Sequence, residues 1–355
     1  MKDKKKIIYF FFPYYHTGGA EKLHLYIAKC FSEDDIRIYF TDRSRDNKNK
    51  KNFYSLAKCI NFFGLNNKIR LFEKIFVYFL SKQINRKENA VVFGSNSRFF
   101  YSLIKQLDNN IRKVDLVHWL GGGGLSDIII KNTPFLTHRV VVTKLIKPIL
   151  KEMYEKAGFE HTQNDKTVII ENWVPLAKKT KKDYMGKLKI LYVGRNTYEK
   201  RTELAISVWR KLKVNKNLEF LFVGPGLESI VSNKEIAVGL VKDDYEMEEL
   251  YRNSHIIMLT SIFEGFPYVI MEGMVYGAVP ITTAVGGISG HLQHGVNSVL
   301  ILEKNPDKII NDIAGYINEL DKDRNKLKIL SDNAYDYSVK NFCHDNCKSY
   351  KKLLE

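Results

Sequence analysis

The segment SIFEGFPYVIMEGMVYGAVPI, residues 261–281, contains two glutamates whose spacing and setting suggest chemistry. Glu264 precedes a Phe-Pro step, and Glu272 follows eight positions later inside an almost unbroken apolar run. A carboxylate among apolar side chains loses hydration unless a partner donates hydrogen bonds to it. A vicinal diol offers two such donors, so the pattern fits the ribose of a nucleotide. Glutamates that only favour a helix N-terminus or pair with nearby cations would give the same pattern.

The elements that hold these glutamates can be predicted from the same part of the sequence. HIIMLT (255–260) predicts a buried strand, and Pro267 is well placed as the first residue of a helix that ends near Gly277. Glu264 then lies in the loop beyond the strand's carboxyl end, where open α/β sheets bind ligands. Glu272 lies in the helix and is expected to be buried. The backbone amides of residues 265–268, with the helix dipole, favour an anion such as phosphate.

Two cations follow another predicted strand. LYVGRNTYEKR (191–201) ends a strand at Gly194 and then presents Arg195 and Lys200. Fixed cations at the carboxyl end of a strand suit a diphosphate, which gains charge as its bond to a sugar breaks. Arginine and lysine are also common on solvated surfaces, so these two positions alone do not establish a site.

A glycine pair marks a loop near the start of the chain. HTGGAEKLHLYIAK (16–29) couples a strand exit to a helix start. Gly18 and Gly19 permit close approach of the backbone to a ligand, and Glu21 complements the helix N-terminus. A tight turn with a capping glutamate explains the same residues without a ligand.

A histidine lies near the end of another predicted strand. DLVHWLGGGGLSD (115–127) places His118 before four glycines. The glycines would form either an adjustable wall for a ligand or a mobile loop. A lone histidine beside apolar residues is more often part of a core, and His16 competes for the same role.

Strand-like and helix-like segments alternate through most of the 355 residues, a length that favours two domains of about 150–180 residues. The predicted strands are 7–12, 36–40, 90–94, 113–120, 138–143, 167–172, 187–194, 218–224, 235–240, 255–260, 279–283 and 297–302. Near-continuous apolar strands alternating with helices predict α/β domains whose parallel sheets are covered on both faces. We expect a Rossmann-like domain at 1–174, a lysine-rich linker at 175–187, a second Rossmann-like domain at 188–335 and a C-terminal helix at 336–355. That helix is expected to pack back toward the first domain.

EGFPYVIME (264–272) resembles the E-x7-E signature of family 4 retaining glycosyltransferases of GT-B fold, in which two Rossmann-like domains face each other across a cleft and enclose a nucleotide-sugar. The following segment, GMVYGAVPITTAVGGISGHLQHGVNSVLI, is similar to that family's small-residue turn and later glycine-containing motifs. The resemblance covers the second half of the chain and, at lower specificity, the first half. It implies that the donor is bound by Gly18, Gly19, Arg195, Lys200, Val241, Glu264, Gly265, Phe266, Pro267 and Glu272.

The resemblance also implies a role for individual residues. Catalytic roles fall to four of them: His118, Glu264, Arg195 and Lys200. His118 would contact the donor sugar near its anomeric carbon, and Glu264 would hold the sugar's hydroxyls. Glu272 would bind the ribose, and the backbone near Val241 would read the base. Arg201 replaces the family's usual glycine after the lysine, where it either adds charge or points outward.

The formal net charge of +16 predicts attraction to polyanions. No nucleic-acid motif accompanies the charge, so nucleic acid is not an expected partner. Residues 51–87 interleave aromatic and aliphatic side chains with eight lysines and arginines, opposed only by Glu73. Much of this segment reads as basic amphipathic helices, which either pack against a core or attach to an anionic membrane surface. No run approaches the roughly 20 apolar residues that span a bilayer.

Cysteines and acidic pairs do not predict a metal site or a cofactor. The four cysteines are scattered, which fits a reducing cytosol better than a disulfide framework: Cys30, Cys59, Cys343 and Cys347. CHDNC (343–347) has too few ligands for a zinc site, and Asp321 and Asp323 lie in a lysine-rich region that we expect to be solvated.

Together these patterns predict a metal-independent enzyme that transfers a sugar with retention from a nucleotide-sugar to a hydroxyl of a cell-surface polysaccharide or lipid-linked glycan precursor. A UDP-sugar is favoured because such donors are the commonest. The expected location is cytoplasmic, at the inner face of the cell membrane. The alternatives are a GDP-sugar-dependent mannosyltransferase, a nucleotide-sugar epimerase or phosphorylase of the same fold, and a basic nucleic-acid-binding protein. The sequence does not predict an oligomeric state.

Overall fold

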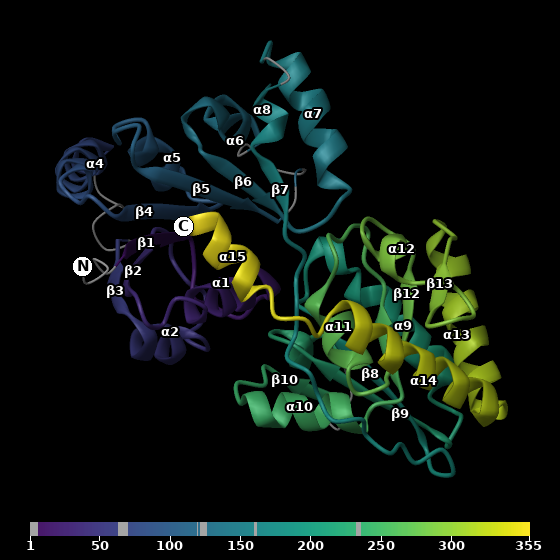
Figure 1. Ribbon diagram of the computed structural model, residues 1–355. Coiled ribbons are helices and arrows are strands. Elements are labelled where there is room, and N and C mark those ends of the chain that lie inside the picture. The colour runs from purple at the N-terminus through teal and green to yellow at the C-terminus, as the bar shows by residue number, and fades with distance from the viewer. Residues whose placement is uncertain (1–5, 63–69, 119, 121–125, 160–161, 232–235) are drawn as a thin grey trace. The chain divides into compact units, whose positions relative to one another are not determined.

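The computed structural model describes residues 6–62, 70–118, 120, 126–159, 162–231 and 236–355. The chain divides into two compact units (Figure 1): an N-terminal unit of Met1–Asn172 with Asn346–Glu355, and a C-terminal unit of Trp173–Asp345. Each unit is built on one parallel sheet flanked by helices, which confirms the predicted α/β class with two Rossmann-like sheets.

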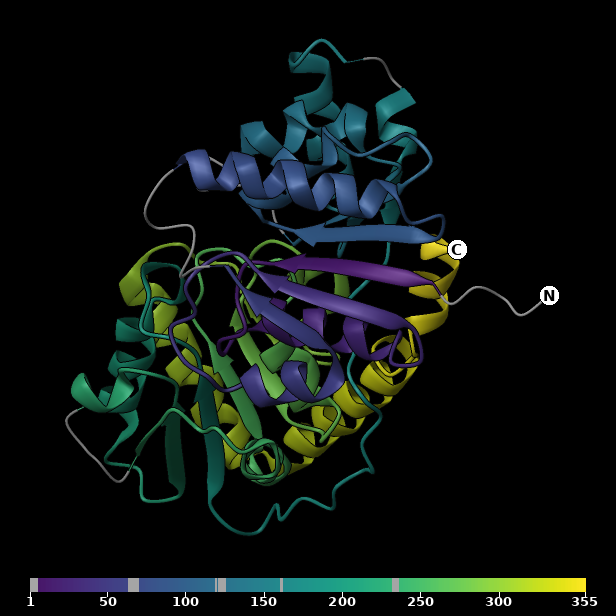
Figure 2. The ribbon, with the colours of Figure 1, turned by 90° about the vertical axis from the view of Figure 1, so that its left-hand side faces the viewer.

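The N-terminal unit has a seven-stranded sheet in the order β3-β2-β1-β4-β5-β6-β7, and all its neighbouring strands are parallel (Figure 2). Its strands are β1 (Ile7–Phe12), β2 (Asp35–Phe40), β3 (Lys58–Asn61), β4 (Ala90–Ser95), β5 (Arg112–Val117), β6 (His138–Val141) and β7 (Thr167–Ile169). The last five residues of β1 are all buried, because helices cover both faces of the sheet.

Side chains of β1 alternate between two helical layers. Tyr9 and Phe11 belong to a core shared with α4, α5, α6 and α7, whereas Phe12 stacks on His24 of α1 and lies near Phe53 of α2. Tyr350 of α15 contacts the same second face. The helices of this unit are α1 (Gly19–Lys29), α2 (Lys50–Leu56), α4 (Arg70–Asn85), α5 (Arg98–Ile104), α6 (Ser126–Lys131), α7 (Ile146–Lys156), α8 (Thr162–Asp165) and α15 (Cys347–Leu354), with a 3-10 turn η1 (Thr133–Phe135).

The C-terminal unit has a six-stranded parallel sheet in the order β10-β9-β8-β11-β12-β13. Its strands are β8 (Leu188–Val193), β9 (Leu218–Val223), β10 (Ala237–Gly239), β11 (Ile256–Leu259), β12 (Val279–Thr283) and β13 (Val299–Ile301). Its helices are α9 (Thr202–Leu212), α10 (Asp244–Asn253), α11 (Tyr268–Met274), α12 (Ile288–His291), α13 (Pro306–Lys322) and α14 (Arg324–Asn341), with 3-10 turns η2 (Tyr198–Lys200) and η3 (Leu227–Ser229). One face of the sheet shares a core with α9, α13 and α14.

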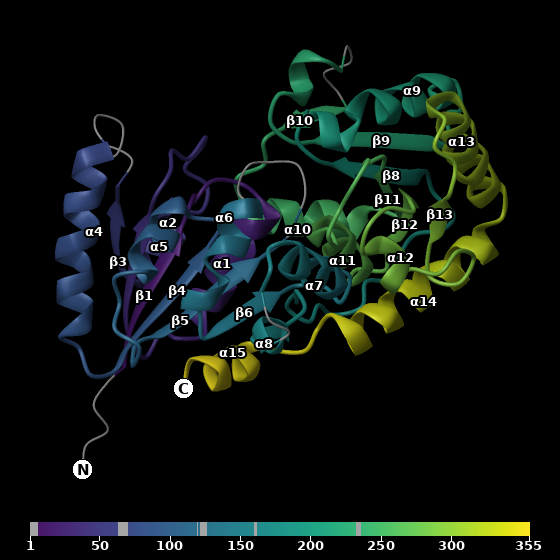
Figure 3. The same ribbon diagram turned by 90° about the horizontal axis from the view of Figure 1, so that it is seen from above.

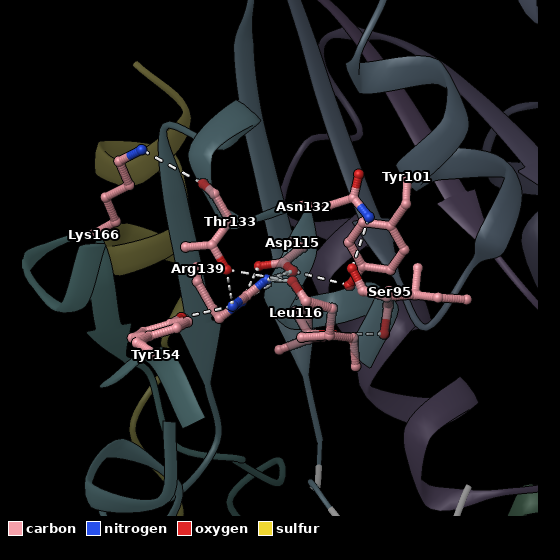
Figure 4. Close-up of polar contacts among 11 residues, drawn as sticks. Ser95, Tyr101, Asp115, Leu116, Asn132, Thr133, Arg139, Tyr154 and Lys166 are labelled. Carbon is pink, nitrogen blue, oxygen red and sulfur yellow. Dashed lines mark hydrogen bonds and ion pairs between the residues drawn. The ribbon is translucent and has the colours of Figure 1, made fainter. Parts of the chain in front are cut away.

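A buried ion pair crosses the N-terminal sheet between β5 and β6 (Figure 4). Arg139 and Asp115 are both fully buried, and Arg139 Nη2 lies 2.8 Å from Asp115 Oδ2. Arg139 Nη1 donates to the hydroxyls of Thr133 and Tyr154 at 2.8 and 2.6 Å, and Tyr101 donates to Asp115 at 2.9 Å. Burial lowers the pKa of Arg139, but the Asp115 carboxylate together with Tyr154 and Tyr101 outweighs burial, so the pKa is raised. Arg139 therefore stays charged and ties both strands to α7 and η1.

All twelve segments predicted as strands contain one, but the sequence prediction missed β3. β3 lies within residues 51–87, which were expected to form basic amphipathic helices. It is a four-residue edge strand whose side chains are half-buried or exposed, so it lacks the apolar run that identified the other strands. Among the described residues of 51–87, the helical expectation is correct for α2 and α4.

Residues 175–187, expected to be a linker, contain no helix or strand and pack along the C-terminal unit. Lys182 Nζ donates to the carbonyl of Arg252 at 2.8 Å, at the carboxyl end of α10. Lys179 forms an ion pair with Asp332 of α14 at 3.0 Å. Lysine suits both positions because a cation neutralises the carbonyl dipoles at a helix C-terminus and pairs with a nearby carboxylate.

A disulfide joins Cys30, just after α1, to Cys347 at the start of α15. The prediction that the cysteines are unpaired is therefore wrong for these two, because residues separated by 317 positions meet in the fold. Cys59 and Cys343 are free. No helix among the described residues is both long enough and apolar enough to cross a membrane.

Candidate active site

Lys200 and Glu264 meet at one edge of the C-terminal sheet. Lys200 ends η2 in the connection after β8, and Glu264 lies in the loop after the neighbouring strand β11. Lys200 Nζ forms an ion pair with Glu264 Oε1, and Ser261 Oγ donates to the same oxygen at 2.7 Å. The two charged side chains are 19% and 11% exposed. The structure thus brings together a cation and a carboxylate that the sequence placed in separate loops.

Arg201 fixes these two loops to each other. Its backbone is in the left-handed region at φ 45°, which normally favours glycine. Its guanidinium donates to the carbonyls of Thr260 at 2.6 Å and Ser261 at 3.0 Å. Arg201 therefore does not point outward, and that alternative from the sequence is wrong, whereas the added charge stays a prediction. Its hydrogen bonds compensate for an unfavourable backbone conformation.

Arg195 lies in the same connection as Lys200 but is more exposed. Its side chain is 37% exposed, and Nη2 lies 3.6 Å from Glu199 Oε1. Thr202 Oγ1 donates to the Arg195 carbonyl at 3.3 Å. A guanidinium on a fixed backbone, with one long contact to a carboxylate of the described residues, retains donors for an anion.

Gly286 explains why the backbone at Glu264 holds its position. A Cβ on Gly286 would lie 1.8 Å from the Glu264 carbonyl oxygen, and its φ of +53° also favours glycine. Gly287 N donates to the same oxygen at 3.3 Å. The Gly-Gly pair after β12 thus packs directly against the loop that carries Glu264.

Glu272 differs from its predicted setting. The helix that carries it, α11, starts after Pro267 and is closed by a turn at Gly277 (φ +75°), as expected, but Glu272 is half-buried rather than buried. Tyr251 of α10 donates to Glu272 Oε2 at 2.7 Å. The apolar run suggested that Glu272 is buried, because the residues beside it in the sequence lie in the core. Its carboxylate instead faces the hydroxyl of Tyr251 on α10.

The remaining predicted donor residues of this unit lie in nearby loops. Gly265, Phe266 and Pro267 connect β11 to α11. The Phe266 ring packs on His291 at 4.5 Å between centroids, so this side chain contributes to the core. Val241 is buried in the connection between β10 and α10.

In the N-terminal unit, the space beside Gly18 is occupied by a side chain. A Cβ on Gly18 would lie 2.0 Å from Glu21 Oε2, and Glu21 is buried. His16 Nε2 lies 3.5 Å from Glu21 Oε1, and Gly19 is the first residue of α1. This geometry favours the turn with a folded-back glutamate as the reason for Gly18.

His118 follows β5 and contacts a second histidine that the sequence did not single out. His24 Nε2 lies 3.1 Å from His118 Nε2, and the His24 ring stacks on Phe12 with a 4.2 Å centroid distance. Burial lowers the pKa of His118 to about 4 and holds that of His24 well below its usual value. Both rings are therefore neutral near pH 7, and one donates to the other. The glycines 121–124 lie outside the described residues.

His118 directly follows β5, a strand held in place by a buried ion pair. Asp115, three residues earlier, belongs to the buried ion pair with Arg139. The sequence analysis missed three partners of His118, Glu264 and Glu272, because they are ordinary core or loop residues until the fold brings them close: His24, Ser261 and Tyr251.

The acidic residues considered for a metal have structural partners. Asp321 pairs with Arg324 and accepts from Asn215 at 3.0 Å, and Asp323 caps α14 through the amide of Lys326 at 2.9 Å. The Asp321 side chain is only 8% exposed, so its predicted solvation is wrong.

An open hollow of about 320 Å³ between α10 and the first halves of β8 and β9 lies at the other end of the strands from Lys200 and Glu264.

The chain is similar in sequence to known glycosyltransferases. Residues 175–337 match the family described as Glycosyl transferases group 1. Over 130 residues the chain is 32% identical to an uncharacterized glycosyltransferase of Methanocaldococcus jannaschii, a match that covers 34% of this chain and 33% of that relative. A second uncharacterized glycosyltransferase of that organism is 24% identical over 96% of this chain and 97% of its own length. The amylovoran biosynthesis glycosyltransferase AmsD of Erwinia amylovora is 32% identical over 25% of this chain and 27% of its own.

Solved structures show the same fold. The lipopolysaccharide outer core galactosyltransferase WaaB in its apo form has a TM-score of 0.70 at 16% identity, covering 98% of this chain and 99% of its own. HepE of Anabaena in complex with UDP-glucose has a TM-score of 0.74 at 14% identity, covering 98% of both chains. The fold is therefore that of GT-B glycosyltransferases. Residues 175–337 match the group 1 glycosyl transferases, and the chain is a transferase.

Proposed function

We propose that this enzyme transfers a sugar, with retention and without a metal, from a nucleotide-sugar to a hydroxyl of a cell-surface polysaccharide or lipid-linked glycan precursor. The observation that carries the proposal is the Lys200–Glu264 pair at the carboxyl ends of β8 and β11, with Arg195 in the same connection. The lysine, the carboxylate and the guanidinium at this end of the sheet suit the sugar and the diphosphate of a nucleotide-sugar. The carboxylate accepts from sugar hydroxyls, and the cations face the phosphates.

The assignments in the C-terminal unit follow from this pairing. Lys200 and Arg195 bind the diphosphate and stabilise its charge as the bond to the anomeric carbon breaks. Glu264 accepts hydrogen bonds from the donor sugar, and Glu272 accepts from the ribose in addition to Tyr251. The loop of Gly265, Phe266 and Pro267 and the backbone near Val241 complete the donor site.

In the N-terminal unit, we assign His118 to the donor sugar near its reacting carbon. A neutral imidazole carries one donor and one acceptor, and the contact with His24 leaves the other ring nitrogen to serve a hydroxyl. Gly18 and Gly19 are assigned to the donor by the family resemblance. Because Glu21 fills the space beside Gly18, a ligand would meet that carboxylate there.

For the chemical step, the acceptor oxygen bonds to the anomeric carbon on the face from which the diphosphate departs. We assign leaving-group stabilisation to Arg195 and Lys200, with no resident cofactor. A UDP-sugar is the favoured donor, supported by the UDP-glucose complex of HepE. A GDP-sugar, as in a mannosyltransferase, is the alternative that a nucleotide screen separates.

The acceptor class is supported by the names of relatives. AmsD is named for amylovoran biosynthesis and WaaB for the lipopolysaccharide outer core. We propose that this enzyme likewise works on a surface glycan or its lipid-linked precursor, at the cytoplasmic face of the cell membrane. The net charge of +16 supports a peripheral contact with anionic lipid.

The test is sugar transfer by Lys200→Ala and Glu264→Gln. Each change should lower kcat/KM by about 100- to 1,000-fold, as the loss of one charge-stabilising donor does elsewhere. Transfer is measured with a screened donor, in the presence and absence of EDTA, and the anomeric configuration of the product is read by NMR.

The matched control is a lysine–glutamate pair of the same unit far from the site. Lys326 Nζ lies 2.6 Å from Glu319 Oε1 on the α13–α14 surface. Lys326→Ala and Glu319→Gln should leave transfer within a factor of about two, because exposed pairs contribute little to stability. Full turnover in both site variants would refute the assignment, and inversion at the anomeric carbon or inhibition by EDTA would refute the mechanism.

A further inference from the structure

Helix α4 lies on one side of the N-terminal unit (Figure 3). It exposes a line of large apolar side chains. Phe72 is 55% exposed, Ile75 44%, Tyr78 51% and Phe79 65%. Phe72, Ile75 and Phe79 follow one another at intervals of three and four residues, so they share one helix face. We call these four residues the α4 face. Isolated exposed apolar residues need no explanation, but a contiguous group usually marks an interaction site.

The opposite side of α4 is firmly held, so the exposure of the α4 face is a feature of the packed helix. Val77, Leu80 and Ile84 are buried in the core of the N-terminal unit. Asn85 Nδ2 donates to the carbonyl of Gln106 at 3.1 Å, which anchors the carboxyl end of the helix to the segment after α5. The helix therefore presents its outer side chains from a fixed support.

Basic side chains continue and flank the α4 face. Lys82 and Arg86 extend the same spacing of three and four residues beyond Phe79 and are exposed, as is Lys74. Lys82 Nζ lies 5.7 Å from the centre of the Tyr78 ring, which places a cation beside the apolar group. Aromatic and aliphatic side chains bordered by lysine and arginine match the chemistry of a lipid headgroup layer over acyl chains.

We propose that the α4 face is the surface by which this protein binds an anionic phospholipid bilayer, with Phe72, Ile75 and Phe79 inserted at the headgroup boundary. Lys74, Lys82 and Arg86 then contact lipid phosphates. This inference gives a structural location to the peripheral contact in the proposed function. It does not depend on sugar transfer, because vesicle binding is measured without donor or acceptor.

A second copy of this chain fits the face less well. The apolar line covers about one heptad, whereas helix pairing of the coiled-coil kind needs three or four. Its continuation at Lys82 and Arg86 would set like charges against each other in a symmetric pair. Nucleic acid would pair with the cations but leave Ile75 and Phe79 against water.

The experiment is flotation of the full chain with vesicles of phosphatidylcholine alone or mixed with phosphatidylglycerol in equal parts. The unmodified protein should float with the mixed vesicles and much less with phosphatidylcholine alone, because the cations supply part of the affinity. Phe72→Ser, Ile75→Ser and Phe79→Ser together should lower the partition coefficient by at least about 100-fold. Lys82→Glu with Arg86→Glu should lower it by about 10-fold or more on mixed vesicles only.

The control replaces three exposed apolar residues of the other unit: Val214→Ser, Leu302→Ser and Ile329→Ser. These side chains are 76%, 81% and 61% exposed, so the control removes comparable exposed apolar surface without touching α4. It should float as the unmodified protein does, and circular dichroism checks that all variants are folded.

Three outcomes would overturn the proposal. The first is no flotation of the unmodified protein with mixed vesicles. The second is equal flotation of the α4 triple variant and the unmodified protein. The third is a dimer or an RNA complex, detected by light scattering or gel shift, that the α4 triple variant abolishes while vesicle binding is unchanged. Failure of sugar transfer in the same preparations would bear on the proposed function alone.

Discussion

At the scale of single residues, the site holds its charges in place before any ligand arrives. Glu264 Oε1 is shared between Lys200 and Ser261, and the Gly286–Gly287 pair fixes its backbone. In the proposed function, a diphosphate would bind Lys200 beside Glu264, whose carboxylate would accept from sugar hydroxyls while both side chains keep nearly the same positions. Such preorganised groups reorient little during the reaction, which is how fixed charges lower a barrier.

The His24–His118 pair predicts a pH dependence of stability. The pKa of His118 is about 4 in the folded chain, against 6.5 in an unfolded one, and burial is the cause. Between these values the unfolded chain binds more protons, so the stability contributed by the neutral pair is present above about pH 6.5 and is lost as pH falls toward 4. We expect His24→Phe to flatten this dependence, because phenylalanine keeps the stack on Phe12 without titrating.

The measurement is the free energy of unfolding by urea at several pH values across that window, for both proteins. His255, whose pKa burial also lowers to about 4, contributes the same slope to each and cancels in the comparison. Identical slopes in the two proteins would contradict the prediction. Over the same window above pH 5, kcat/KM should show no acid limb from His118, because the ring is already neutral.

At the scale of elements, Arg201 links the connection after β8 to the end of β11. Arg201→Ala loses two charge-assisted hydrogen bonds and keeps the left-handed backbone, so it should lower the free energy of unfolding by about 2–4 kcal/mol. Arg201→Gly loses the same bonds but removes the strain, and should be about 1 kcal/mol more stable than the alanine variant. Chemical denaturation followed by tryptophan fluorescence gives both values. An alanine variant as stable as the glycine variant would show that the strain is not significant.

The sequence predicted elements well where their pattern was strong. Twelve apolar runs contained strands, because buried parallel strands must be apolar on both faces. β3 escaped because an exposed edge strand needs no such run. Glu272 was expected in the core because its neighbours are apolar, but sequence alone does not reveal that Tyr251 faces it.

At the scale of the whole molecule, distant contacts could not be read from the sequence. Cys30 and Cys347 are separated by 317 positions, and only the docking of α15 onto the N-terminal unit makes them neighbours. His24 of α1 and His118 after β5 are also far apart in the sequence, and the fold of the N-terminal unit brings them into contact. The positions of the loops carrying Lys200 and Glu264 were predictable, because each follows a buried parallel strand whose carboxyl end lies at the same end of the sheet.

The central claim is that the edge of the C-terminal sheet holding Lys200, Glu264 and Glu272 binds a nucleoside diphosphate. The most direct measurement is thermal unfolding of the full chain with UDP, GDP and ADP, repeated for Lys200→Ala. We predict that one diphosphate at 100 times its dissociation constant stabilises the unmodified protein by about 2.7 kcal/mol, and that Lys200→Ala abolishes most of this gain at the same concentration. No stabilisation by any of the three nucleotides, or equal stabilisation of the variant, would contradict the account.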